Sequence, residues 1–156
     1  MGCEIGSHSY RHADLGKMDQ AALEADLAAA DAAFTEVLGQ APTMLRPPYG
    51  SMSKAVKGLS DRVLVTWSVD PRDWATSDTA FIEKNVLKSV SDGDIILLHD
   101  MTDSSVDAAL EIVDKLQSQG FRFATVSQLA AMRGYRLQPG KVYTHFPRKK
   151  TGAAQP

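Results

Sequence analysis

The segment VLVTWSVDPRDWATSDTAFIEKNVLKSVSDGDIILL, residues 63–98, carries the clearest structural signal in this chain of 156 residues. Val63–Val69 is rich in β-branched and aromatic side chains, which predicts a strand. A helix begins at Asp78 or Thr79, because apolar residues recur from there at helical spacing. The apolar residues of Asp94–Leu98 predict a strand that is covered on both faces. A strand, a helix and a second strand predict a parallel βαβ unit.

The same alternation extends toward the N-terminus. Cys3–Gly6 is predicted to be the end of a strand, and Thr43–Leu45 is a second, short strand. Between them, Asp19 caps a helix that ends at Gly39. Ser53 caps a shorter helix before the segment at 63–98 begins.

The alternation also extends toward the C-terminus. Ser104 or Ser105 begins a helix, Phe121–Val126 is a strand, and Ser127 caps a last helix. Strand and helix therefore alternate about five times, which predicts an α/β protein with parallel strands. A barrel and a doubly wound sheet both fit this order.

The length suits a single domain, which we place at residues 1–134. Residues 135–156 lack the alternation and are predicted to be a C-terminal extension that is partly disordered, with a disordered tail at Arg148–Pro156. The single cysteine, Cys3, excludes an internal disulfide and is expected to be a small buried strand residue. Met1–Glu4 has neither a basic start nor an apolar stretch, so no signal peptide is expected.

Composition excludes some classes of partner. The formal net charge is -2, which gives no electrostatic reason to expect binding to nucleic acid. No apolar stretch reaches the roughly 18 residues that a membrane-spanning helix needs. With 44% hydrophobic and 23% charged residues, the composition is that of an ordinary globular protein.

Two histidines, His8 and His12, follow the first predicted strand in the stretch SHSYRH. Neutral imidazole is a good ligand for zinc and similar ions. A spacing of four residues lets both rings face one ion if the segment makes a helical turn. Two unrelated histidines in a polar loop are the alternative, so the pair gains weight only from the motifs that accompany it.

The stretch RPPYG, Arg46–Gly50, follows the second predicted strand. Its paired prolines fix an extended turn, and Gly50 permits a sharp bend. Rigid backbone of this kind can direct an N–H group at a developing oxyanion, and Arg46 can orient a carboxylate. A structural turn with a surface arginine is an equally good interpretation of this stretch alone.

Two more polar clusters follow the strands of the segment at 63–98. Asp73 and Trp74 come after Val69, and a carboxylate beside a loop tryptophan suits sugar binding. An anchoring tryptophan with a capping aspartate is the alternative. His99 follows the second strand directly, where a histidine can transfer a proton. Since ligands bind at the C-terminal ends of parallel strands, the four clusters predict one site.

In their order, the four clusters resemble the motifs of the polysaccharide deacetylases of carbohydrate esterase family four, the NodB-homology domains. The resemblance covers about residues 3–133 and matches the family's second to fifth motifs in turn with His8/His12, Arg46–Gly50, Asp73-Trp74 and Leu97-Leu98-His99. It implies a distorted (β/α) barrel of the polysaccharide deacetylase type. It also implies that metal-activated water hydrolyses N- or O-acetyl groups on peptidoglycan, a chitin-type polymer or xylan.

The resemblance implies a role for each residue that matches. His8 and His12 bind a divalent metal ion, which is usually zinc in this family. His99 is the general acid that protonates the leaving amine, Asp73 tunes it, and Arg46 positions the catalytic base.

The remaining matches concern the acetylated polysaccharide. The backbone N–H of Tyr49 holds the oxyanion, and Trp74, Leu97, Pro48 and Tyr49 line the groove for the acetyl group and the sugar. Because members of the family mostly act outside the membrane, an extracellular or cell-wall location is expected.

One motif of the family has no counterpart here. It is an aspartate pair that supplies the general base and the third metal ligand, and only seven residues precede His8. We therefore expect an N-terminally incomplete domain that lacks its first strand and is inactive alone, with Asp14 a weak substitute for the missing carboxylates. The alternatives are a non-catalytic carbohydrate-binding relative and a hydrolase of small amides.

Overall fold

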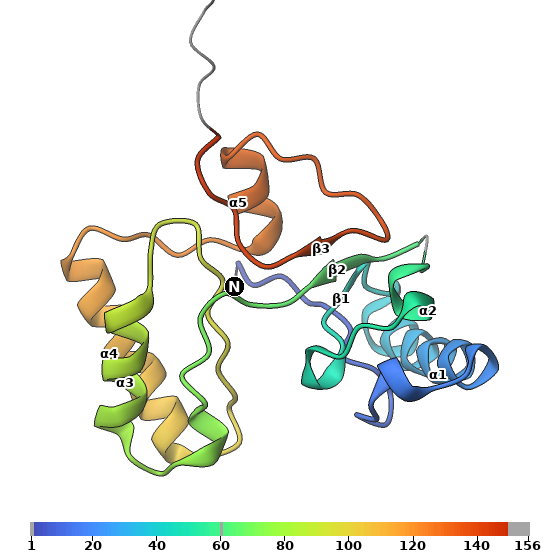
Figure 1. Ribbon diagram of the computed structural model, residues 1–156, viewed down its shortest axis with the longest axis horizontal. Helices are drawn as coiled ribbons and strands as arrows, with labels where there is room; N and C mark the ends of the chain where they lie inside the picture. Colours follow the sequence, from blue (N-terminus) through green and yellow to red (C-terminus); the bar gives the residue numbers. More distant parts are fainter. Residues whose placement is uncertain (1, 60, 150–156) are drawn as a thin grey trace, which may run out of the picture. The chain divides into compact units, whose positions relative to one another are not determined.

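The computed structural model describes residues 2–59 and 61–149, and none of their helices combines the length and the apolar character needed to cross a membrane (Figure 1). The chain divides into two compact units. Unit 1 holds the described residues up to Thr66 together with Arg136–Tyr143. Unit 2 holds Trp67–Tyr135 together with the described residues from Thr144 onward.

Unit 1 is built on a small parallel sheet with helices beside it. Its strands lie in the order β1-β2-β3, and each neighbouring pair is parallel. Met44 of β1 lies opposite Val63 of β2, and Leu64 of β2 lies opposite Val142 of β3. The elements are η1 (Leu15–Lys17), α1 (Gln20–Leu38), β1 (Met44–Leu45), η2 (Pro48–Gly50), α2 (Lys54–Lys57), β2 (Val63–Val65) and β3 (Val142–Tyr143), where η is a 3₁₀ helix.

The helix α1 begins and ends at the residues that the sequence predicts. The carboxylate of Asp19 accepts a hydrogen bond from the N–H of Ala22 at 2.8 Å, which satisfies a helix-end donor. Gly39 ends the helix in the left-handed conformation, with φ +77°. The apolar face of α1 packs in the core of unit 1, which contains Leu15, Leu23, Leu27, Leu45, Val56 and Leu64.

Unit 2 is mainly helical. Asp78 caps α3 as predicted, and α3 packs along α4 in Figure 1. Their buried faces form a core together with Val69. The core consists of Val69, Ile82, Val86, Ala108, Ile112 and Leu116. The elements are η3 (Asp73–Ala75), α3 (Thr79–Ser89), α4 (Asp103–Ser118) and α5 (Val126–Met132).

The predicted helices α4 and α5 begin earlier than expected. Thr102 caps α4, rather than Ser104 or Ser105, and its hydroxyl accepts from the N–H of Ser105 at 3.3 Å. Thr125 caps α5 in place of Ser127. Its hydroxyl accepts from the N–H of Gln128, whose side chain accepts from the N–H of Thr125 in return. This reciprocal pair is a capping box, which satisfies two donors at once.

Two predicted strands are not among the strands of the described residues. Within Asp94–Leu98, Ile96 forms an isolated parallel bridge to Val69, and the N–H of Leu97 donates to the carbonyl of Val69 at 2.9 Å. Phe121–Ala124 is outside any strand among the described residues. Cys3 is exposed rather than buried, so the expectation for this residue is wrong.

Ordered structure continues beyond residue 134. The N–H of Phe146 donates to the carbonyl of Gly93 at 2.7 Å, and the Phe146 side chain is fully buried. Gly93 has φ +101°, and a Cβ there would overlap the carbonyl oxygen of Phe146. Arg148 begins the predicted tail but forms an ion pair with Asp92 at 3.1 Å, and residues 150–156 lie outside the described residues. The domain boundary at residue 134 stays a prediction.

Candidate active site

The loop with the two histidines belongs to unit 1 and begins beside β1. The N–H of Ser7 donates to the carbonyl of Met44 at 2.8 Å, and the N–H of Arg46 donates to the carbonyl of Ser7 at 2.9 Å. This pairing holds residue 7 parallel to β1, so that the loop and the residues after β1 start from the same edge. His8 and Arg46 are therefore neighbours despite their distance in sequence.

The rings of His8 and His12 lie close together. Their centroids are 4.9 Å apart in an edge-to-face arrangement. Nδ1 of His8 is hydrogen-bonded to the carbonyl oxygen of Arg46, so that Nδ1 carries the proton and Nε2 has the lone pair. Metal-binding histidines usually donate their other ring N–H to a carbonyl or carboxylate in this way.

The RPPYG stretch adds a second set of groups to this edge. Pro48 is buried, and Tyr49 has φ +60°, a left-handed conformation that a bulky residue rarely adopts. The exposed ring of Tyr49 contacts His12, with centroids 5.1 Å apart, and its hydroxyl donates to the carbonyl of His12 at 3.4 Å. Burial lowers the pKa of the Arg46 guanidinium, although arginine stays charged in proteins.

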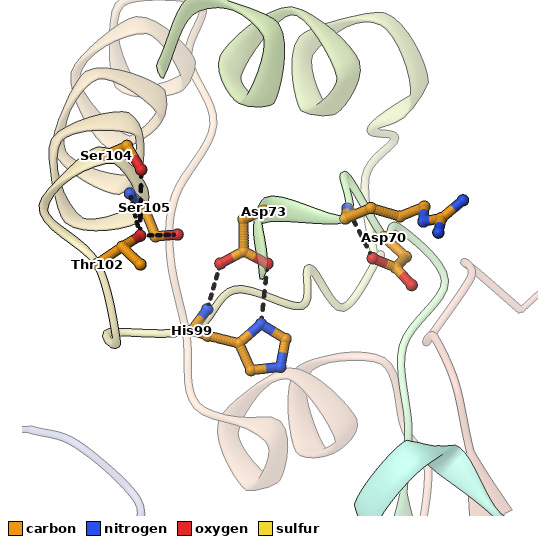
Figure 2. Close-up of polar contacts among 7 residues, drawn as sticks. Asp70, Asp73, His99, Thr102, Ser104 and Ser105 are labelled. Carbon is orange, nitrogen blue, oxygen red and sulfur yellow. Dashed lines mark hydrogen bonds and ion pairs between the residues drawn. The ribbon is translucent and has the colours of Figure 1, made fainter. Parts of the chain in front are cut away.

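Unit 2 has its own pair of polar residues, a buried carboxylate and a histidine. Asp73 begins η3, and its side chain is fully buried. Figure 2 shows its two oxygens accepting from one residue: Oδ2 from the backbone N–H of His99 at 2.7 Å and Oδ1 from Nδ1 of His99 at 2.8 Å. This arrangement fixes both the position of the His99 ring and its tautomer.

The charge state of Asp73 follows from its surroundings. Burial alone would raise the pKa of the Asp73 carboxyl. The hydrogen bonds from the ring and backbone N–H of His99, together with that from the Ser105 hydroxyl, outweigh burial and hold this pKa below its ordinary value. Asp73 is therefore a carboxylate at neutral pH and can stabilise a positive charge on His99.

The other residues of unit 2 that the sequence singles out lie near this pair in the chain. Trp74 is 59% exposed, and the guanidinium of Arg72 lies 5.2 Å from its ring centroid. Leu97 is buried. Thr102, and not Asp100 beside His99, caps α4, and Asp73 orients the His99 ring.

The described residues fit part of a metal site. No group of three His, Cys, Asp or Glu side chains in residues 2–59 and 61–149 is arranged to hold an ion. The ring centroids of His8 and His12 are 4.9 Å apart, and the bond from Nδ1 of His8 leaves its Nε2 available as a ligand. The Asp14 carboxylate bonds to other groups: it accepts a hydrogen bond from the N–H of Gly16 at 3.1 Å and forms an ion pair with Lys17 at 3.1 Å. A site at the two histidines therefore needs a further ligand.

The sequence gives no role to Asp26, although its position carries a signal. Asp26 lies three residues after Leu23 and four before Ala30, on the face of α1 that is otherwise apolar. Its side chain is fully buried and accepts hydrogen bonds from the loop that carries the histidines. A carboxylate on an apolar helix face indicates a buried partner.

Comparisons with known proteins agree with the sequence motifs. The family model described as polysaccharide deacetylase matches residues 1–65. Peptidoglycan-N-acetylglucosamine deacetylase PgdA of Listeria monocytogenes is 34% identical over 91% of this chain. The chain spans only 30% of the length of that relative.

Solved structures give the same assignment. A structure described as T48 deacetylase with substrate is 35% identical, with a TM-score of 0.83, over 90% of this chain and 69% of that one. A family 4 acetyl xylan esterase from Clostridium thermocellum, in complex with a cobalt ion, is 28% identical over 92% of this chain and 73% of that one, with a TM-score of 0.83. The predicted α/β fold of the polysaccharide deacetylase type is confirmed. The chain belongs to the polysaccharide deacetylases of carbohydrate esterase family four.

Proposed function

We propose that this chain carries the metal-binding and proton-transfer residues of a hydrolase that removes acetyl groups from a polysaccharide. The observation that carries the proposal is the Asp73–His99 pair, in which one fully buried carboxylate accepts from the backbone N–H and from Nδ1–H of the histidine. Burying a carboxylate is costly, and in this pair one oxygen orients the His99 ring while the other accepts from the His99 backbone. That arrangement suits a general acid or base.

In the proposed reaction His99 delivers a proton from Nε2. Because Nδ1–H is held by Asp73 at 2.8 Å, Nε2 is the ring nitrogen that takes up and releases the catalytic proton. The negative charge of Asp73 stabilises the protonated ring. His99 then protonates the leaving nitrogen of an N-acetyl group, or the leaving oxygen of an O-acetyl group.

His8 and His12 are proposed to hold a divalent metal ion, with zinc as the first candidate. When bound, the ion polarises the acetyl carbonyl and lowers the pKa of water. The hydrogen bond between Nδ1 of His8 and the carbonyl of Arg46 holds the ring so that Nε2 is the ligand atom. His12 is kept beside it by the contact with the Tyr49 ring.

The remaining residues are proposed to position the substrate. Arg46 orients the carboxylate that acts as base, and the backbone N–H of Tyr49 donates to the oxyanion. Trp74, Pro48 and Leu97 are each proposed to contact the acetylated sugar. The exposed indole of Trp74 suits stacking on a pyranose ring.

Peptidoglycan is the first candidate substrate, because the relatives include peptidoglycan deacetylases. This substrate implies an extracellular or cell-wall location. No Asp-Asp pair occurs in the 156 residues, so we propose that the chain alone releases little or no acetate.

Acetate release tests the proposal. The zinc-loaded chain and a version extended at its N-terminus by the aspartate-pair segment of a relative are incubated with acetylated peptidoglycan, chitin oligosaccharides and acetylated xylan. We expect acetate from the extended version and not from the chain alone. Absence of acetate from both would contradict the proposal and favour a non-catalytic carbohydrate-binding relative.

A further inference from the structure

The loop between the two histidines has a strained backbone. Ser9 has φ +69° and His12 has φ +54°, both in the left-handed region that residues other than glycine seldom adopt. Strained conformations persist only where surrounding contacts impose them. The side chain of Ser9 contributes one such contact, because its oxygen accepts from the N–H of His12 at 2.9 Å. That contact is internal to the loop and does not tie it to the rest of unit 1.

Asp26 of α1 ties the loop to the core of unit 1. Its Oδ2 accepts from the N–H of Tyr10 at 2.9 Å, and its Oδ1 accepts from the N–H and from Nε of Arg11, each at 3.3 Å. Two successive backbone N–H groups form a concavity that favours an anion. All three bonds come from the segment between His8 and His12.

The exposed fractions of the Asp26 and Arg11 side chains indicate that Asp26 holds the loop, and not the reverse. The Asp26 side chain is 0% exposed, whereas that of Arg11 is 65% exposed. The carboxylate is therefore fixed by the packing of α1, while the loop lies on the surface. A buried charge costs free energy unless it is paired, so an apolar residue would serve the packing of α1 better than an aspartate does.

We propose that Asp26 is a positioning residue that holds the His8–His12 loop in the geometry for metal binding. This inference rests on the metal-binding role proposed above for His8 and His12. Asp26 acts through the backbone at Tyr10 and Arg11 and does not touch the metal. It sets the ring separation of the two histidines before an ion arrives.

The test is a titration of the full chain with Zn²⁺, followed through the ring nitrogen signals of His8 and His12 by NMR. The variant is Asp26→Asn, which keeps the size of the side chain. One of its carboxylate oxygens becomes an NH₂ group, which cannot accept the hydrogen bond from the loop N–H that it faces. The matched control is Asp31→Asn, because Asp31 lies on the same helix and pairs with Arg62 instead of the loop. Asp26→Glu, which keeps the charge, is the rescue variant.

We expect Asp26→Asn to weaken Zn²⁺ binding by about tenfold or more, the lower end of the effect of residues that orient metal ligands. Asp31→Asn should bind as the wild-type chain does, and Asp26→Glu should recover most of the loss. Equal affinity of wild type and Asp26→Asn would overturn this inference alone. If Zn²⁺ leaves the histidine signals of the wild-type chain unchanged, the proposed metal site fails, and this inference fails with it.

Hydrogen exchange on the wild-type chain keeps the inference testable if Asp26→Asn does not fold. Without metal, the amides of Tyr10 and Arg11 should exchange much more slowly than those of an unstructured peptide, because both donate to the buried carboxylate. Exchange at the rate of an unstructured peptide would show that Asp26 does not order the loop, and would overturn the inference.

Discussion

The histidine loop of unit 1 and the Asp73–His99 pair of unit 2 are held in different ways. The loop is held by several contacts. Two of its residues have a left-handed backbone, and His12 is exposed. The pair depends on one fully buried carboxylate whose two oxygens both bond to His99. We infer that the proposed proton-transfer geometry is set by Asp73 alone, whereas the proposed metal-binding geometry depends on Asp26 together with the contacts of His8 and Tyr49.

The largest expected effect is on turnover when His99 is replaced, because His99 is proposed to transfer the proton and not to bind the metal. In an extended, active version of the chain, His99→Ala should lower turnover by about 10²- to 10⁴-fold, the usual contribution of general acid–base catalysis. Zinc binding should be retained. Acetate release and zinc content measure the two effects.

His99→Asn is the matched control for the fold. Its amide N–H can take the place of Nδ1–H and donate to Asp73, while the proton-transferring Nε2 is lost. Equal turnover of His99→Asn and the parent would exclude His99 as the acid. Loss of zinc in step with turnover would instead make it a metal ligand.

The second expected effect concerns the histidine loop. His12→Asn should weaken Zn²⁺ binding by more than the roughly 10- to 100-fold that residues behind the ligands contribute. Asparagine is chosen because it tolerates the left-handed backbone at φ +54°. Calorimetry with Zn²⁺ measures the change, and His145→Ala, outside the site, should match the wild type. Stoichiometric, tight zinc in His12→Asn would exclude His12 as a ligand.

The third prediction uses the lowered pKa of Asp73. Because the folded-state pKa lies below the ordinary value of about 3.9, the ionised carboxylate stabilises the fold above that pH. This stabilisation is lost as the pH falls through the lowered folded-state pKa. The free energy of unfolding of the wild type should therefore fall more steeply under acid than that of Asp73→Asn.

Urea unfolding at neutral pH and at about pH 3 measures this difference. The control is Asp70→Asn, which changes an exposed carboxylate in the same segment and leaves Asp73 in place. Parallel losses in wild type and Asp73→Asn would show that Asp73 contributes nothing to the acid dependence.

The smallest effect is expected at Trp74. In the extended version, Trp74→Ala should raise KM for the polysaccharide about two- to tenfold, as expected for an aromatic contact of about 0.5–1.5 kcal/mol. Its loss of the Arg72 contact should cost roughly 0.5–1 kcal/mol of stability. Phe81→Ala, another exposed aromatic residue of unit 2, should leave KM unchanged. An unchanged KM in Trp74→Ala would remove Trp74 from the residues proposed to contact the sugar.

Helix ends are predictable where the sequence offers a single residue that suits the position. Asp19 and Gly39 bound α1 as predicted, because a carboxylate at the start and a glycine at the end each satisfy backbone groups that the helix leaves unpaired. The start of α4 was harder, since Thr102, Ser104 and Ser105 are all capable caps. The hydrogen bond from the N–H of Ser105 to Thr102 selects the first of them.

Strand pairing was less predictable than strand composition. Asp94–Leu98 has the apolar composition of a central strand, but a strand also needs a partner along its length, and Ile96 has a single bridge to Val69. The strand β3, Val142–Tyr143, is not predicted, because it lies after residue 134, where the alternation of strands and helices ends in the sequence.

Local sequence predicted the proposed site residues, but not what holds them. His8, His12 and His99 stand out because polar residues follow predicted strands. Asp26 is remote from His8 in sequence, and its role depends on how α1 packs beneath the loop. That contact is tertiary, and periodicity alone marks Asp26 only as an exception on an apolar face.

The close contact between Gly93 and the backbone of Phe146 limits how this chain can be engineered. Since the backbone carbonyl of Phe146 occupies the space that a side chain at position 93 would need, any substitution of Gly93 must displace the chain at position 146. A deletion series from the C-terminus should keep soluble expression until it removes the buried ring of Phe146, and then lose it abruptly. A shortened version of the chain should therefore keep Phe146.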